Sequence, residues 1–164
     1  MRIAFGADDR TALTDALVDE LRRRGHDVKV YGPPAGEPLQ WADVAVAVAR
    51  DVASGAADQG VLLCWTGTGV CMAANKVPGV RAALCGDAET ARGARAWNDA
   101  NVLCMSLRTT TEILAREILD AWFATTRVDP TELESIAKVR ELDRQRSEAP
   151  AGAGSPRPDA GDPV

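Results

Sequence analysis

A run of apolar residues passes directly into a glycine-rich loop in residues 61–76, which read VLLCWTGTGVCMAANK. Four consecutive apolar residues, 61–64, are typical of a parallel strand that helices cover on both faces. Gly67 and Gly69 then permit tight backbone turns, and residues 69–75 are long enough for a short helix. A strand followed by a loop and a helix is the repeating unit of α/β folds.

The same alternation of short apolar runs and helical patterns continues on both sides of this stretch. Residues 41–53, for example, place Val44, Val48 and Val52 on one face of a helix. Strands alternating with helices imply right-handed βαβ units, so we expect an open α/β sandwich around a five-stranded parallel sheet. The expected strands are 3–5, 28–30, 61–64, 80–84 and 102–105, and the expected helices are 11–24, 41–53, 69–75, 88–96 and 111–125.

A sixth helix is expected near the C-terminal end. Asp129 can cap it and Pro130 suits its first position, so that it should run to about residue 147. Its apolar residues form one stripe that needs a partner, either the sheet or a second subunit: Leu133, Ile136, Val139 and Leu142. We expect one domain over residues 1–147 and a disordered tail over residues 148–164, which are rich in Ala, Gly, Pro and Asp.

Composition limits the classes of partner. The 164 residues carry a net charge of −5, with 46% hydrophobic and 26% charged residues, which is the balance of a soluble globular protein. We expect no nucleic-acid surface, because phosphate binding needs uncompensated Lys and Arg. No apolar run approaches the ~18 residues of a membrane span, and no signal peptide is recognisable. We therefore expect a cytoplasmic protein without a membrane partner.

The cysteines and the single histidine limit the metal chemistry. No C-x-x-C pair occurs and His26 is alone, so no metal site is expected. Cys85 and Cys104 are expected to be small buried hydrophobic residues, and His26 a structural residue between a helix and a strand. Cys64 differs, because it ends the third strand, where open α/β sheets place their ligand sites.

The loop after Cys64 is suited to binding an anion. Its glycines allow successive N–H groups to point into one concavity and to meet the N-terminus of the following helix. Such a nest binds a phosphate or a developing enolate oxygen. Gly-x-Gly alone is a weak signal, and this loop lacks the spacing of a dinucleotide fingerprint or of a Lys-Ser/Thr phosphate loop.

Six short motifs follow one another along the chain: Gly6-Ala7-Asp8, Cys64-x-Thr66-Gly67-x-Gly69, Ala73-Ala74-Asn75-Lys76, Arg81-Ala82-Ala83, Asn98-Asp99-x-Asn101-Val102-Leu103 and Ser106-x-Arg108. In this order they resemble the ribose-5-phosphate isomerase B and galactose-6-phosphate isomerase family, over about residues 1–145. The resemblance implies a Rossmann-like three-layer sandwich and a homodimer or homotetramer with shared active sites, its C-terminal helix used in dimerisation. It also implies aldose–ketose isomerisation of a sugar or sugar phosphate through a cis-enediolate, without metal or cofactor.

The resemblance further implies roles for the residues that match its motifs. Cys64 aligns with a catalytic thiol that, as a thiolate, would take the C2 proton and return it at C1. Thr66 aligns with a hydroxyl that assists at the sugar oxygen. The remaining matches are the enediolate-binding amides of Gly67, Thr68 and Gly69, the substrate-contacting Asp8 and Asn98, and the phosphate-binding Arg108.

Each of these residues also has a structural interpretation. Cys64 could be a buried thiol at a strand end and Asp8 a helix N-cap. Asn98 could serve only the loop, and Arg108 could be a surface charge. Lys76 is expected to be structural or exposed rather than catalytic.

Four expected pocket residues depart from the family pattern. Asp9 stands where the family usually has a histidine, and Trp97 where it has the histidine that opens the sugar ring. Trp65 replaces a common glycine, and Trp41 lies near the position of a common tyrosine. These tryptophans either wall a narrower aromatic pocket or fill the core, and Trp122 is expected in the core. Family arginines that bind phosphate before the last helix are represented at most by Arg127.

We therefore expect an isomerase of a pentose or tetrose phosphate. Loss of the ring-opening histidine favours an open-chain or short substrate, because a tetrose phosphate cannot close a phosphorylated ring. Fewer positive charges and the added Asp9 weaken phosphate binding. Two alternatives therefore stay open: a non-catalytic sugar-binding member of the family, and an epimerase or isomerase of a non-phosphorylated sugar.

Overall fold

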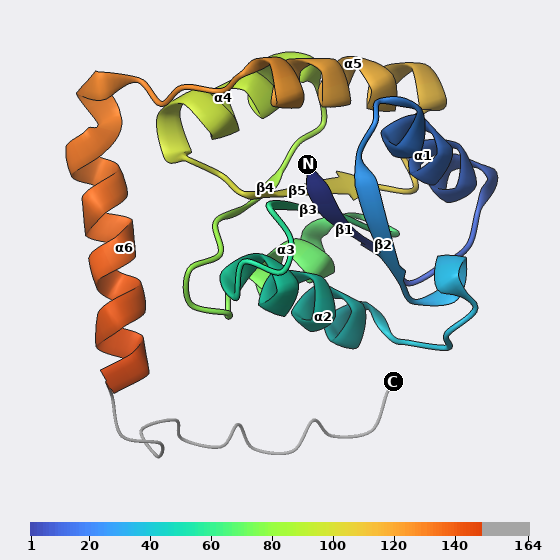
Figure 1. The fold of residues 1–164 in the computed structure, drawn as a ribbon, viewed down its shortest axis with the longest axis horizontal. Coiled ribbons are helices and arrows are strands. Elements are labelled where there is room, and N and C mark those ends of the chain that lie inside the picture. Colours follow the sequence, from blue (N-terminus) through green and yellow to red (C-terminus); the bar gives the residue numbers. More distant parts are fainter. Residues whose placement is uncertain (149–164) are drawn as a thin grey trace, which may run out of the picture.

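The computed structural model describes residues 1–148 as alternating strands and helices (Figure 1). The strands are β1 (Arg2–Ala7), β2 (Asp27–Tyr31), β3 (Gln59–Cys64), β4 (Ala82–Leu84) and β5 (Val102–Ser106). The helices are α1 (Ala12–Arg23), α2 (Trp41–Ala53), α3 (Thr68–Ala74), α4 (Ala88–Asn98), α5 (Glu112–Ala124) and α6 (Leu133–Glu148), with 3-10 turns at Pro33–Ala35 and Pro130–Glu132. The expected tail, apart from Glu148 at the end of α6, lies outside the described residues.

The five strands form one sheet in the order β2-β1-β3-β5-β4, and all its neighbours are parallel. The chain builds β2 on one side of β1. From β3, on the other side, it crosses to the edge strand β4 and returns to β5, so the direction of winding reverses between β1 and β3. Ligands of open α/β sheets bind at such a reversal, beyond the carboxyl ends of the strands. The expected three-layer architecture is thereby confirmed.

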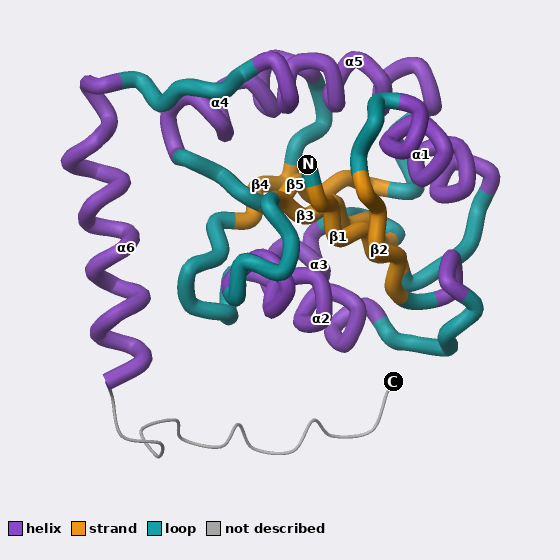
Figure 2. The backbone as a smooth tube through the Cα atoms, viewed as in Figure 1, coloured by secondary structure: helices purple, strands orange, loops and turns teal. Residues whose placement is uncertain are grey.

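Alternate residues of the central strands pack on opposite faces of the sheet. On one face, Phe5, Leu63 and Met105 pack with side chains of α1, α4 and α5. On the other, Leu62 and Cys64 pack with side chains of α2 and α3. Figure 1 shows the two helical layers, and Figure 2 shows the sheet between them. Both faces are covered, which is why the central strands are continuously apolar.

Several individual expectations hold. Trp122 is fully buried, and its indole N–H donates a hydrogen bond to Gln59 Oε1 (2.6 Å). Cys85 and Cys104 are buried thiols. Asp129 caps the 3-10 turn that leads into α6, where its carboxylate accepts the N–H of Thr131.

Several boundaries differ from the expected ones by a few residues, and two of the differences have a local cause. β4 begins at Ala82 rather than at residue 80, and helix α6 begins at Leu133 after the 3-10 turn. β4 starts late because the Arg81 N–H donates to the Asn101 side chain, which replaces a bond to a neighbouring strand.

Helix α6 stands beside the three-layered body rather than on the sheet (Figure 1). Of its expected apolar stripe only Ile136 is buried, while Leu133, Val139 and Leu142 are 45–57% exposed. Polar contacts tie the helix to the body: the Arg140 guanidinium reaches Asp99 (2.7 Å) and Asp143 accepts the N–H of Gly79 (2.9 Å). Within residues 1–148, no helix is long and apolar enough to cross a membrane.

The turn between β3 and α3 depends on Gly67. Its φ is +75°, in the left-handed region, and its N–H donates to the Cys64 carbonyl (3.1 Å). A Cβ at this position would lie 2.5 Å from Leu84 Cδ1 and 2.9 Å from the Met105 backbone. Both the conformation and the space therefore require glycine here.

We expect Gly67→Ala to lower the free energy of unfolding by about 3 kcal/mol, since backbone strain and overpacking add. The matched control is Gly36→Ala, where φ is +82° but nothing lies within 4 Å of the new Cβ. The free energy of unfolding of this control should fall by only about 1 kcal/mol, because backbone strain acts there without overpacking. Urea denaturation measures both, and equal losses would show that close packing around Gly67 is unimportant.

His26 lies in the turn between α1 and β2, where its ring packs on Phe123 with a centroid separation of 4.7 Å. Its Nδ1 is buried and has no hydrogen-bond partner among the described residues. Burial lowers the pKa of His26 from 6.5, and the nearby N-terminus and Arg24 add to the effect. The residue therefore has a structural place, as expected.

The lowered pKa of His26 predicts a loss of stability in acid. Below about pH 6.5 the unfolded chain binds the proton more readily than the folded protein, so the free energy of unfolding falls as pH falls. We expect wild type to lose more stability than His26→Gln between pH 7 and pH 5, because carboxyl titrations are common to both. Urea denaturation at each pH measures the free energy of unfolding. An equal fall in both proteins between pH 7 and pH 5 would contradict this prediction.

Candidate functional site

The carboxyl edge of the sheet gathers most of the expected site residues. Asp8 and Asp9 follow β1, Trp41 begins α2, the segment from Cys64 to Gly69 joins β3 to α3, and Arg108 follows β5. The register of the sheet pairs Ala7 with Leu63, and Cys64 with Ser106. The loops after β1, β3 and β5 therefore start side by side at one edge.

Trp97 and Asn98 lie elsewhere. They form the last turn of α4, which leads to the amino end of β5, where Val102 pairs with Gly60. These two residues line a hollow with Ala83 and Leu84 of β4 and do not belong to the loops after β1, β3 and β5. Trp97 is 42% exposed, with the Arg92 guanidinium 4.9 Å from its ring. Its exposed position excludes the core-filling interpretation for this tryptophan.

Cys64 is the last residue of β3 and is 5% exposed. It belongs to the apolar cluster beneath α2 and α3, which fits the structural interpretation of a thiol at a strand end. Its carbonyl accepts two N–H groups, from Gly67 (3.1 Å) and Leu107 (2.9 Å). The backbone of Cys64 is thus fixed by both the loop after β3 and the loop after β5.

The loop amides divide into two kinds. The N–H of Gly67 is engaged by the Cys64 carbonyl, so the expectation that it binds an anion with its neighbours needs correction. The N–H groups of Thr68 and Gly69 open α3 and have no acceptor within residues 1–148, as is usual for the first turn of a helix. The hydroxyls of Thr66 and Thr68 lie beside them and hydrogen-bond to each other (2.6 Å).

The two acidic residues after β1 lie next to the loop that enters α1. Thr11, not Asp8, caps α1, because its hydroxyl accepts the N–H of Thr14. The N-cap interpretation of Asp8 is therefore wrong. Burial raises the pKa of Asp8, and the nearby Asp9 carboxylate adds to the rise. The Asp8 carboxyl is partly desolvated and available to a ligand.

Two tryptophans lie at this edge. The ring of Trp41 packs on Gly69, with its atoms 3.0–3.4 Å from the place where a Cβ would sit. Trp41 is 43% exposed and Trp65 65% exposed, so neither belongs to the core. An aromatic face at the start of α3 suits the apolar side of a sugar.

Sequence reasoning did not single out Cys71, the second thiol of α3. It lines a groove of about 420 Å³ with Thr68, Met72, Asn75, Lys76 and Leu84. A hydrogen bond from the Cys104 thiol is the main cause that lowers the pKa of Cys71 to about 7. Its sequence context resembles a helix interior, so only the fold reveals the neighbouring thiol.

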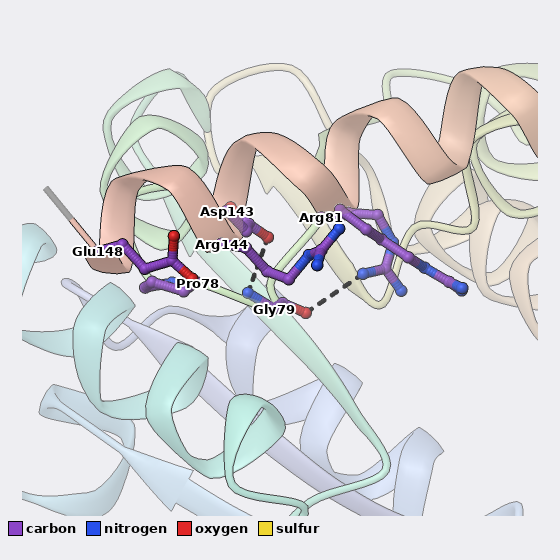
Figure 3. A pocket seen from close by; sticks show the side chains of 7 residues that line it. Pro78, Gly79, Arg81, Asp143, Arg144 and Glu148 are labelled. Carbon is purple, nitrogen blue, oxygen red and sulfur yellow. Dashed lines mark hydrogen bonds between the residues drawn. The ribbon is translucent and has the colours of Figure 1, made fainter.

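A second hollow, of about 570 Å³, lies between α6 and the loop before β4 (Figure 3). The Gly79 N–H donates to Asp143, and the Arg81 guanidinium donates to the Gly79 carbonyl (3.3 Å). Arg81 and Arg140 both pair with the Asp99 carboxylate. These paired charges dock α6 and lie apart from the carboxyl edge. Among residues 1–148, no three His, Cys, Asp or Glu side chains gather to hold a metal ion.

Comparison with known proteins agrees with this architecture. A model of the family described as Ribose/Galactose Isomerase matches residues 3–141. The chain is 40% identical to D-erythrulose-4-phosphate isomerase of Pectobacterium atrosepticum, covering 74% of this chain and 82% of the relative. It is 33% identical to ribose-5-phosphate isomerase B of Escherichia coli, covering 89% and 99% of the two chains.

Among solved structures, ribose-5-phosphate isomerase B of Clostridium thermocellum superposes with a TM-score of 0.83 and 34% identity. That superposition covers 89% of this chain and 99% of the other. Similarity of sequence and of fold thus extends over nearly all described elements, including the loops at the carboxyl edge. The chain belongs to the ribose/galactose isomerase family and is an isomerase.

Proposed function

We propose that this protein interconverts an aldose and a ketose phosphate of four or five carbons, with Cys64 as the base. The observation that carries the proposal is the loop after β3: a thiol at the strand end is followed by two helix-opening amides without acceptors in residues 1–148. The resemblance to named sugar-phosphate isomerases over most of the chain supports it.

The proposed chemistry is a proton transfer between neighbouring carbons. The Cys64 thiolate takes the hydrogen from C2 of the aldose, and the electron pair left behind forms the C1–C2 double bond of a cis-enediolate. The resulting thiol then returns the proton to C1, while the proton of the C2 hydroxyl moves to the oxygen on C1 and leaves the ketose carbonyl. The Thr68 and Gly69 amides hold the charged oxygen, and Thr66 assists the proton transfer between oxygens.

The proposed substrate is an open-chain sugar phosphate, with a tetrose phosphate preferred. His26, the single histidine, packs on Phe123 in the turn before β2 and cannot open a ring at the carboxyl edge. A tetrose 4-phosphate needs no ring opening, because its O4 is esterified. The relative named for D-erythrulose 4-phosphate supports this choice. Arg108 would hold the phosphate, and Asp8 a sugar hydroxyl.

We further propose that two copies complete each site, as a homodimer or within a homotetramer. Trp97 and Asn98 belong to the last turn of α4 and not to the loops after β1, β3 and β5, which supports a role for them in the site of another copy. The exposed apolar stripe of α6 offers a surface for that copy. Four free cysteines suit the cytoplasm as the place of action.

Cys64→Ser should abolish isomerisation while leaving the fold intact. Incubation of tetrose, pentose and hexose phosphates in deuterated water would show carbon-bound deuterium by NMR if the base exchanges its proton. We expect exchange with wild type and a fall of at least about 100-fold with Cys64→Ser. Cys71→Ser, the matched thiol seven residues later, should retain exchange. No exchange by wild type on any substrate would refute the proposed function and leave a sugar-binding role.

Trp97→His should restore assistance to ring opening. We expect it to raise kcat/KM for ribose 5-phosphate by roughly tenfold, because an imidazole can transfer the ring-opening proton. The value for erythrulose 4-phosphate should not rise, since this substrate has no ring. Trp97→Phe controls for removal of the indole. An equal rise for both substrates would count against the choice of an open-chain sugar.

A further inference from the structure

Two consecutive carbonyls at the end of β3 accept hydrogen bonds from the loop that follows β5. The Cys64 carbonyl accepts the N–H of Leu107 (2.9 Å), and the Trp65 carbonyl accepts the N–H of Arg108 (3.0 Å). The Trp65 carbonyl also accepts the hydroxyl of Ser106 (2.9 Å). The two loops therefore form one hydrogen-bonded unit at the carboxyl edge.

Ser106 is at the centre of this unit. It ends β5, pairs in register with Cys64 and is 9% exposed. Its hydroxyl donates to the Trp65 carbonyl and at the same time accepts the N–H of Thr109 (3.2 Å). The Thr110 N–H closes the same turn on the Ser106 carbonyl (3.1 Å). A small side chain that both donates and accepts is needed here, because the site is buried and both partners are backbone groups.

Arg108 projects from this turn. It is exposed, and among residues 1–148 no carboxylate forms an ion pair with it, so its guanidinium is open to an anion. Cys64 ends the neighbouring strand on the other side of the same hydrogen bonds. The Ser106 hydroxyl thus bridges Trp65 and Thr109, the residues that directly follow Cys64 and Arg108 in their loops.

We propose that Ser106 is a positioning residue that fixes the span between Cys64 and Arg108, and so selects the substrate by its chain length. This inference rests on the proposed function, because it takes Cys64 as the base and Arg108 as the phosphate ligand. A phosphate bound at a fixed distance from the base brings C1 and C2 into place only for a chain of matching length. Loosening the turn lets the span vary, which costs rate with the matching substrate and relaxes discrimination.

The kinetic test compares Ser106→Ala with wild type on erythrulose 4-phosphate and ribulose 5-phosphate. We expect kcat/KM for the preferred substrate to fall on the order of 10- to 100-fold. The ratio of kcat/KM for the preferred substrate to kcat/KM for the other substrate should shrink at least about tenfold. Ser106→Thr, which keeps the hydroxyl, should recover the ratio. The control variant Thr125→Val removes a comparable hydrogen bond from a hydroxyl to a carbonyl (2.8 Å) at the end of α5, and it should leave the ratio of the two kcat/KM values unchanged. An equal loss on both substrates would mean a merely structural role and overturn the proposal.

A second measurement is independent of catalysis. Hydrogen exchange followed by mass spectrometry should show faster exchange of the Gly67, Leu107, Arg108 and Thr109 amides in Ser106→Ala than in wild type, with α5 unchanged. If wild type proves inactive, the proposed function fails, while this measurement still judges the link between the two loops. Unchanged exchange of these amides would overturn the proposal even if the enzyme is active.

Discussion

The carbonyl of Cys64 is the contact on which the candidate site depends. It accepts one N–H from the turn that enters α3 and one from the loop after β5. The first bond closes the turn at Gly67, in a backbone conformation that other residues adopt only with strain. The second bond, from the Leu107 N–H, joins β3 to the residue that follows β5, just past the last paired residues of the two strands. Together they decide where α3 begins and which of its amides are left for a ligand.

That arrangement makes the site a property of three adjacent loops rather than of one motif. In the proposed site, the glycine loop supplies the thiol and two amides without acceptors in residues 1–148, and the β1 loop supplies a partly desolvated carboxyl at Asp8. The β5 loop supplies Arg108, whose guanidinium forms no ion pair with a carboxylate of the described residues. Trp41 covers the start of α3 through its contact with Gly69. The loops after β3 and β5 are short and hydrogen-bonded to each other, so these two have little conformational entropy left to lose when a substrate binds.

The other end of the molecule is organised around Asp99. This residue has φ of 50°, the single positive value outside glycine in residues 1–148, and its carboxylate receives both Arg81 and Arg140. Asp99 directly follows Asn98, so its ion pair with Arg140 connects the end of α4, which carries Trp97 and Asn98, to α6. Helix α6 thus leaves its apolar stripe exposed because its docking contacts with the body are largely polar.

The sequence by itself determined the layers of the fold, because buried parallel strands need continuous apolar runs and amphipathic helices need a regular stripe. It also indicated the loop after β3, since paired glycines at a strand end have few other uses. Only the tertiary structure decided that Gly67 gives its N–H to Cys64, that Thr11 rather than Asp8 caps α1, and that Cys71 meets Cys104. The fold likewise placed Trp97 and Asn98 in the last turn of α4, outside the three loops that carry the other candidate residues. Such outcomes depend on which strands become neighbours, and local propensity carries no information about strand order.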